Sequence, residues 1–121
     1  MRSTANALYE FFSGFGIPAY LQDTIPDNAQ MPYITYELFE PECLTTAFFN
    51  ASVWYKDTGL DAISRKVDEI RDAIGNGGVT LHTEEGVIRL YRDERFAQMM
   101  SDPNPETKRA YLSMIIMNNQ I

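Results

Sequence analysis

The chain has 121 residues, of which 45% are hydrophobic, so it is long and apolar enough to fold around one core. Its formal net charge of −7 disfavours nucleic-acid binding through a broad basic face, because an acidic surface repels phosphate groups. No apolar run reaches the roughly 18 to 20 residues that cross a bilayer, and the N-terminus leads into an amphipathic stretch, so we expect neither a membrane protein nor an exported one.

The first predicted helix begins near Ser3 or Thr4, either of which can cap it. Gly14, Gly16 and Pro18 follow and end it, since glycine favours the end of a helix and proline cannot continue one. Before this end, apolar side chains recur at the spacing of one helical face: Ala5, Leu8 and Phe12, with Phe15 next in the series.

Three extended segments and a long link come next. A short piece, Ile17 to Leu21, leads into a link, Gln22 to Pro32, whose Pro, Asp and Asn residues are poor occupants of a strand interior. Tyr33 to Phe39 alternates and is rich in aromatic and β-branched residues, which predicts a strand. A longer strand is predicted from Thr45 to Lys56. The link is long enough to be a functional arm.

The clearest pattern in the sequence is an amphipathic helix from Gly59 to Ile74. Asp57 or Thr58 is expected to cap it, and the glycine-rich segment 75–78 ends it. Its apolar side chains fall at steps of three and four residues and therefore form one stripe, which we expect to pack on the sheet: Leu60, Ile63, Val67, Ile70 and Ile74.

The C-terminal part of the chain predicts a hairpin, a loop and a last strand. The hairpin joins Val79 to Thr83 with Gly86 to Arg92. Arg95 to Pro105 is predicted to be a second long loop, closed by Asp, Pro and Asn residues. The last strand, Lys108 to Met117, is apolar on both sides, which indicates a central strand or one that a partner covers.

These elements predict one α+β domain covering residues 1–121. No strand–helix–strand alternation repeats along the chain. We therefore expect a mostly antiparallel or mixed sheet with two helices packed on it, in the order α-β-β-β-α-β-β-β.

No enzyme site is predicted. His82 is the only histidine, and Glu84 and Glu85 are the only nearby groups in sequence that could act with it. Cys43 is the only cysteine, so it forms neither an internal disulfide nor a thiolate metal cage, and it fits a reducing compartment. The segment 75–78 follows a helix, whereas a phosphate cradle precedes one. We expect no catalytic, cofactor-binding or metal-binding residues.

Arg89, Arg92 and Arg95 lie close together in the sequence and could form a local basic patch. Asp93 and Glu94 stand beside them as counter-charges, which favours a solvated strand end instead. An acidic protein also suits a passage along which DNA slides without sticking.

The aromatic and methionine content exceeds what two short helices and a small sheet need inside, and such residues are enriched in interface cores. The competing interpretation is a second core layer, covered by the other helix, with loop residues tucked under their own loops. We predict an interface that includes Ile25, Met31, Phe48, Trp54, Phe96, Met99, Met100 and Tyr111.

Three segments carry a resemblance to a known family. They are Met31 to Leu38 after the first helix, Trp54 to Asp57 running into the second, and an ending in which Asp102-Pro103 leads through Arg109 into Tyr111 to Ile116. In this order of elements the chain resembles the tail-terminator and head–tail joining (tail completion) proteins of long-tailed bacteriophages.

The resemblance implies a structural virion assembly protein without catalysis or cofactor. Such a subunit forms a ring, typically a hexamer, that caps the tail tube and docks to the head connector, so its partners would be further copies, tail-tube protein and connector proteins. DNA would pass through the ring without specific binding. The implied location is the virion tail or neck, and the host cytoplasm during assembly.

Two other classes of function stay open. The chain could be a host cytoplasmic protein-interaction or small-ligand binding domain, or an enzyme whose site the sequence does not reveal.

Overall fold

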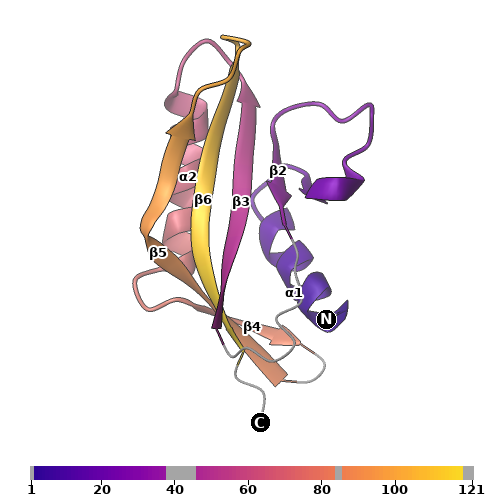
Figure 1. Ribbon diagram of the computed structural model, residues 1–121, viewed down its shortest axis with the longest axis vertical. Coiled ribbons are helices and arrows are strands. Elements are labelled where there is room, and N and C mark those ends of the chain that lie inside the picture. Colours follow the sequence, from indigo (N-terminus) through magenta and orange to yellow (C-terminus); the bar gives the residue numbers. More distant parts are fainter. Residues whose placement is uncertain (1, 38–45, 84–85, 119–121) are drawn as a thin grey trace.

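The computed structural model describes residues 2–37, 46–83 and 86–118 of the chain (Figure 1). Its elements, in chain order, are α1 (Arg2–Ser13), β1 (Ala19–Leu21), the short 3-10 helix η1 (Gln22–Thr24), β2 (Tyr33–Tyr36), β3 (Thr46–Lys56), α2 (Asp61–Ile74), β4 (Val79–Thr83), β5 (Gly86–Met100) and β6 (Thr107–Asn118). Two α-helices and one sheet within these residues confirm the α+β class.

The six strands form one mixed sheet in the order β1-β2-β3-β6-β5-β4. β1 runs parallel to β2, and all other neighbours are antiparallel. β6 lies between β3 and β5, which confirms that a strand apolar on both sides is central in this fold.

Both helices cover the same face of the sheet. On β3, the side chains of Phe49, Ala51 and Val53 point to the helix-covered face and are buried there. They lie opposite the buried residues of β6: Met114, Leu112 and Ala110. α2 packs on this face through Ile63, Val67, Ile70 and Ile74. Leu60 was expected in the same stripe, but it is 51% exposed because the helix begins only at Asp61.

α1 packs beside α2 on this face. The Phe12 ring stacks on Tyr36 and Phe49, with ring centroids 5.4 and 6.0 Å apart. α1 also contacts β1 and β4, which are the two opposite edges of the sheet. The sheet is therefore curled around α1, with β4 and the first part of β5 turned beneath it (Figure 1).

The predicted loop from Arg95 to Pro105 is wrong in its first half, because β5 continues to Met100. The strand pairs with β6 from Ile88 to Arg92, shifts its register between Arg92 and Ala97, and pairs again up to Met100. The charged run Asp93 to Arg95 occupies this irregularity, which interrupts the alternation that sequence reasoning relies on. Residues 101–106 do connect β5 to β6 without a strand.

The ends of α2 differ slightly from the prediction. The Asp57 carboxylate accepts the N–H groups of Thr58 and Gly59, at 2.7 and 3.3 Å, in a turn that precedes the helix rather than capping it. Gly75 ends the helix with φ of 74°, a conformation that glycine adopts without a Cβ penalty. Residues 38, 39 and 45, which belong to predicted strand ends, lie outside the described residues.

Candidate interaction surface

The face of the sheet opposite the helices, here called the open face, carries the candidate site. Figure 1 looks onto this face, with α2 behind the strands. The interpretation in which the second helix covers a second core layer is wrong, because α1 and α2 share the other face. Six side chains from three strands, β2, β3 and β6, form a cluster on the open face, here called the Trp54 cluster: Tyr33, Thr35, Ser52, Trp54, Arg109 and Tyr111.

Trp54 lies across the boundary between β2 and β3. Its indole Nε1–H donates a hydrogen bond of 2.9 Å to Thr35 Oγ1. Thr35 is only 2% exposed, so this bond satisfies a polar group that would otherwise be buried without a partner. The bond also fixes the orientation of the indole ring.

Arg109 extends the cluster from β3 to β6. Its Nε–H donates to Ser52 Oγ at 3.1 Å, and Ser52 is 3% exposed. The guanidinium carbon lies 4.6 Å from the Trp54 ring centroid and 5.7 Å from that of Tyr111, so one cation stacks against two rings. These contacts hold the arginine in one position before any partner binds.

Aromatic rings continue the cluster toward the β1 edge. Tyr33 lies 6.4 Å from Trp54, and Tyr20 lies 5.8 Å from Tyr33, both as centroid distances. The open face thus carries a strip of rings that runs across β1, β2, β3 and β6. A rigid aromatic surface with a fixed cation is typical of interface cores, where Tyr, Trp and Arg are enriched.

Four of the predicted interface residues share the open face. Trp54 and Tyr111 belong to the cluster, Met100 lies opposite Arg109 and is 40% exposed, and Phe48 lies further along β3 and is 71% exposed.

The other four predicted residues lie elsewhere. Phe96 is 6% exposed and packs into the core under the Arg71 guanidinium, so the expectation that it stands on an accessible loop is wrong. Met99 pairs with Ala110 and therefore faces the helix side of the sheet, although it is 45% exposed. Ile25 and Met31 are half-buried in the link. Their role as interface residues stays a prediction.

Sequence reasoning missed Tyr33, Thr35, Ser52 and Arg109 as parts of the surface. The alternation in Tyr33 to Tyr36 put Tyr33 and Thr35 on one face, which was a usable signal. The contact between Arg109 and Ser52 joins residues 57 apart in sequence and depends on the register of β3 against β6. No pattern within a single strand reveals it.

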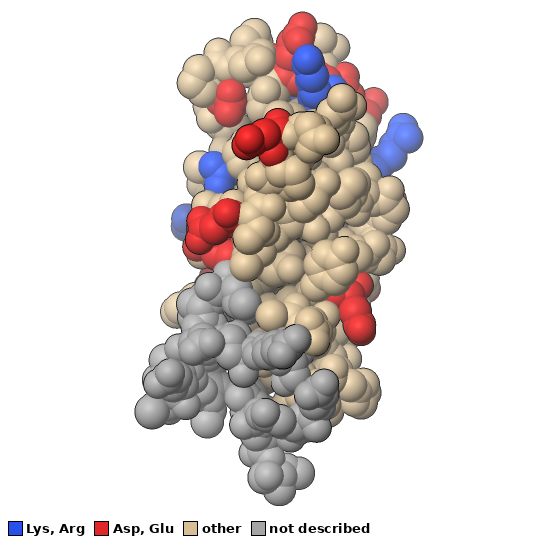
Figure 2. Space-filling view, turned by 90° about the vertical axis from the view of Figure 1, so that its right-hand side faces the viewer, with Lys and Arg blue, Asp and Glu red and all other residues tan. Residues whose placement is uncertain are grey.

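The side of the molecule that carries α1, β2 and the link faces the viewer in Figure 2. Uncharged side chains cover most of the visible described surface, with acidic groups and a few Lys or Arg side chains among them. Asp23 and Asp27 are exposed on the link.

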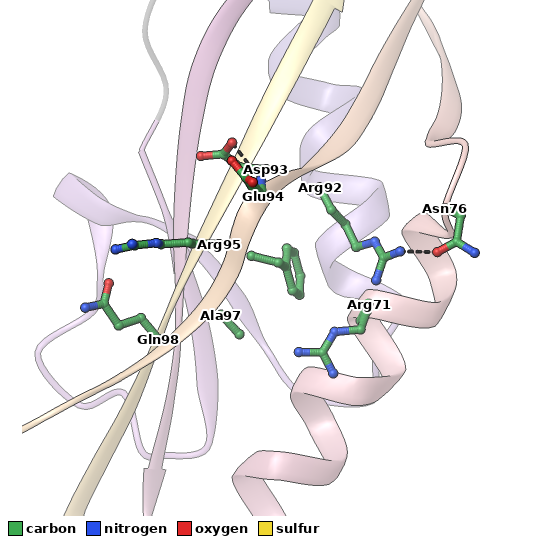
Figure 3. Close-up of a pocket in the computed structure, with 9 residues that line it drawn as sticks. Arg71, Asn76, Arg92, Asp93, Glu94, Arg95, Ala97 and Gln98 are labelled. Carbon is green, nitrogen blue, oxygen red and sulfur yellow. Dashed lines mark hydrogen bonds between the residues drawn. The ribbon is translucent and has the colours of Figure 1, made fainter.

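A hollow of about 640 Å³ lies between the end of α2 and the irregular part of β5 (Figure 3). Arg71 and Arg92 project into it on the α2 side, whereas Arg95 projects to the other side of β5. Arg92 donates a hydrogen bond to Asn76 Oδ1, and Arg71 Nη1 donates to Asp68 at 2.7 Å. Both cations are already engaged, so the hollow is a weak candidate for anion binding.

The three arginines of the predicted basic patch, Arg89, Arg92 and Arg95, do not lie together. Arg89 donates three hydrogen bonds, to Gly77 O, Thr80 Oγ1 and the Tyr91 hydroxyl. It thereby ties the segment after α2 to β5. Arg89, Arg92 and Arg95 serve three separate places rather than one nucleic-acid surface.

No group of three or more His, Cys, Asp and Glu among the described residues could hold a metal ion. His82 is exposed on β4, and Cys43 lies outside the described residues. Burial, and secondarily the nearby Tyr9, raise the pKa of Tyr36 above its ordinary value of 10.0. No helix within the described residues is long and apolar enough to cross a membrane.

Comparisons with known proteins give a likeness of fold alone. No protein-family model and no curated protein matches the sequence. Among solved structures, the fold is similar to that of a chain described as "Virion of native gene transfer agent (GTA) particle". The TM-score is 0.67, the match covers 93% of this chain and 91% of that chain, and 14% of the residues are identical. At this identity the likeness is one of fold, extending over nearly the whole length of both chains.

Proposed function

We propose that the protein is a structural component of a phage-like virion, and specifically a tail-terminator or head–tail joining subunit. In this role, copies of the chain form a ring that caps the tail tube and docks to the head connector. One observation carries the proposal: nearly the whole chain shares its fold with a chain of a phage-like virion particle. The three sequence segments that resemble tail-completion proteins support the finer role.

The open face suits such a role because a ring subunit needs surfaces that are rigid before assembly. In the Trp54 cluster, a hydrogen bond of 2.9 Å to Thr35 holds the indole ring, and one of 3.1 Å to Ser52 holds the Arg109 cation. Preorganised side chains lose little conformational entropy when a partner covers them. Phe48, at 71% exposure, adds an apolar group that gains from being covered.

The proposal is tested by adding the purified protein to tail tubes of the phage or prophage that encodes it. Negative-stain electron microscopy should show an added ring at one end of each tube, and antibody against the protein should label that end alone. Tubes assembled without the protein are expected to vary in length. Labelling along the whole tube, or no labelling at all, would contradict the terminator role.

The alternative is a host protein-interaction domain that uses the same open face. It predicts a complex with a host protein and no binding to tail tubes. Size-exclusion chromatography with light scattering, with and without purified tail-tube protein, separates the two proposals. A mass that changes only when tail-tube protein is present supports the virion role.

A further inference from the structure

Charge is distributed unevenly along the chain. It contains 10 Lys and Arg residues, and all but Arg2 lie at Lys56 or later. The segment from α1 through β2 to Glu37 therefore contributes no Lys or Arg after Arg2, and among the described residues the cation that reaches it is Lys66 of α2, which donates to Phe15 O. Its described acidic residues are Glu10, Asp23, Asp27 and Glu37. This region is an electrostatic match for a cationic surface elsewhere.

Arg109 supplies such a surface at the centre of the Trp54 cluster. Within the described residues, only its Nε–H has a hydrogen-bond acceptor, which is Ser52 Oγ. Its Nη groups can still donate to a carboxylate, and guanidinium–carboxylate hydrogen bonds are among the strong ones in proteins. The nearby rings of Trp54 and Tyr111 offer apolar area for the residues that flank such a carboxylate.

The link carries the complementary chemistry. Asp23 and Asp27 are exposed, and between them lie Ile25 and Pro26, which can pack on aromatic rings. The link lies at the β1–β2 side of its own sheet and does not cover β3, β6 or β5 (Figure 1). A subunit therefore presents its link and its Trp54 cluster as two separate surfaces.

We propose that the Trp54 cluster binds the link of a second copy of this chain, with Arg109 pairing with Asp23 or Asp27. The contact joins two different surfaces, so each added copy still offers one free link and one free cluster. Such a head-to-tail contact continues until it closes into a ring. The inference rests on the proposed ring function and identifies the two surfaces that would mate.

The test uses charge reversal on each surface. A cluster variant, Arg109→Glu, and a link variant, Asp23→Lys with Asp27→Lys, should each lower the association constant of the chain by roughly tenfold or more. An equimolar mixture of the two variants should restore association, because every contact then joins groups of opposite charge. Sedimentation velocity across a concentration series measures the association of the cluster variant, the link variant and their mixture.

Matched controls lie on the outer face of α2. Arg65→Glu and Asp61→Lys reverse exposed charges away from both surfaces and should leave association at the wild-type level. Added salt should weaken wild-type association, since salt screens the attraction between the opposite charges of the two surfaces as they approach. Thermal melting of every variant separates lost association from lost folding.

Several results would overturn the contact: a wild-type chain that stays monomeric throughout, variants that associate as the wild type does, or a mixture that stays dissociated. Should Arg109→Glu unfold, Arg109→Gln removes the charge, and the link variant changes exposed residues only. Tube capping is scored separately. Wild-type capping that the charge variants do not affect rejects this contact and leaves the proposed function; absent wild-type capping rejects the function itself.

Discussion

The two faces of the sheet use the same strands for opposite purposes. On the helix-covered face, Val53, Ala110 and Leu112 are fully buried, and their side chains are small or aliphatic. On the open face, their neighbours Trp54, Arg109 and Tyr111 are large, half-buried and held by hydrogen bonds and stacking. Alternation along a strand separates the two sets residue by residue.

The comparison separates residues that hold the fold from residues available for contacts. Changes on the helix-covered face should affect the free energy of unfolding. Changes to the exposed side chains of the open face should affect association and leave folding largely intact. Four predictions test this division, beginning with the largest effect.

Replacing Ile70 with Asp should unfold the protein. Ile70 is 0% exposed, and an unpaired carboxylate in the core costs several kcal/mol against a total stability of about 5 to 15 kcal/mol. Arg65→Asp, on the exposed side of the same helix, is the matched control and should melt cooperatively. A cooperative melt of Ile70→Asp, followed by circular dichroism, would show that α2 does not pack as described.

Phe12 and Phe48 allow the two faces to be compared with one substitution. Phe12→Ala should lower the free energy of unfolding by about 3 to 5 kcal/mol, because Phe12 is 0% exposed and stacks on two rings. Phe48→Ala, at a position that is 71% exposed, should change it by only about 0.5 kcal/mol. Urea denaturation measures the free energy of unfolding of both variants. Equal decreases would show that the two faces do not differ in their contribution to stability.

Gly78 marks a place where the main chain packs against an open-face ring. Its φ is 84°, and an added Cβ would lie 2.6 and 2.8 Å from ring carbons of Tyr91. Gly78→Ala should therefore destabilise the protein by about 1 to 3 kcal/mol. Gly77→Ala is the control, since nothing lies within 4 Å of its added Cβ. If both variants unfold at the same urea concentration, Gly78 has neither the positive φ nor the close approach to Tyr91 described here.

Tyr36, on the helix-covered face, makes the free energy of unfolding depend on pH in the alkaline range. Burial raises the pKa of Tyr36 above 10.0, so the folded protein keeps the phenol proton where the unfolded chain has released it. This contribution to stability is complete below pH 10 and is lost as the pH rises through the folded-state pKa. As the pH rises above 10, the Tyr36→Phe variant should lose less stability than the wild type. Urea denaturation across this pH range measures the difference, and identical curves would show that the pKa of Tyr36 is not raised by burial.

Sequence patterns were most informative where one element buries one regular face. The spacing of Ile63, Val67, Ile70 and Ile74 predicts the packed side of α2, because a helix buried on one side requires that period. The apolar character of β6 on both sides predicts its central place. The same reasoning failed at Leu60, where a turn anchored by Asp57 delays the start of the helix.

The features that the sequence did not predict depend on contacts between distant segments of the chain. The charged run from Asp93 to Arg95 suggested a loop, but pairing with β6 keeps β5 in the sheet on both sides of the irregularity. Trp54 and Tyr111 were predicted as interface residues from their type alone. Arg109 contacts Trp54 and Tyr111 because of the register of β3 against β6, which the sequence does not reveal. Phe96 was also predicted as an interface residue, but the irregularity in β5 turns its side chain into the core.

The curl of the sheet also limits how copies of the chain can join through their main chains. β1 has three residues and β4 has five, and α1 packs against both of these edge strands. Short, partly shielded edges offer few free N–H and C=O groups to an incoming strand, which is how natural sheets avoid edge-to-edge pairing. Growth of the sheet across molecules, and with it fibril formation, is therefore disfavoured, and the proposed contacts between copies would use side chains on faces and links.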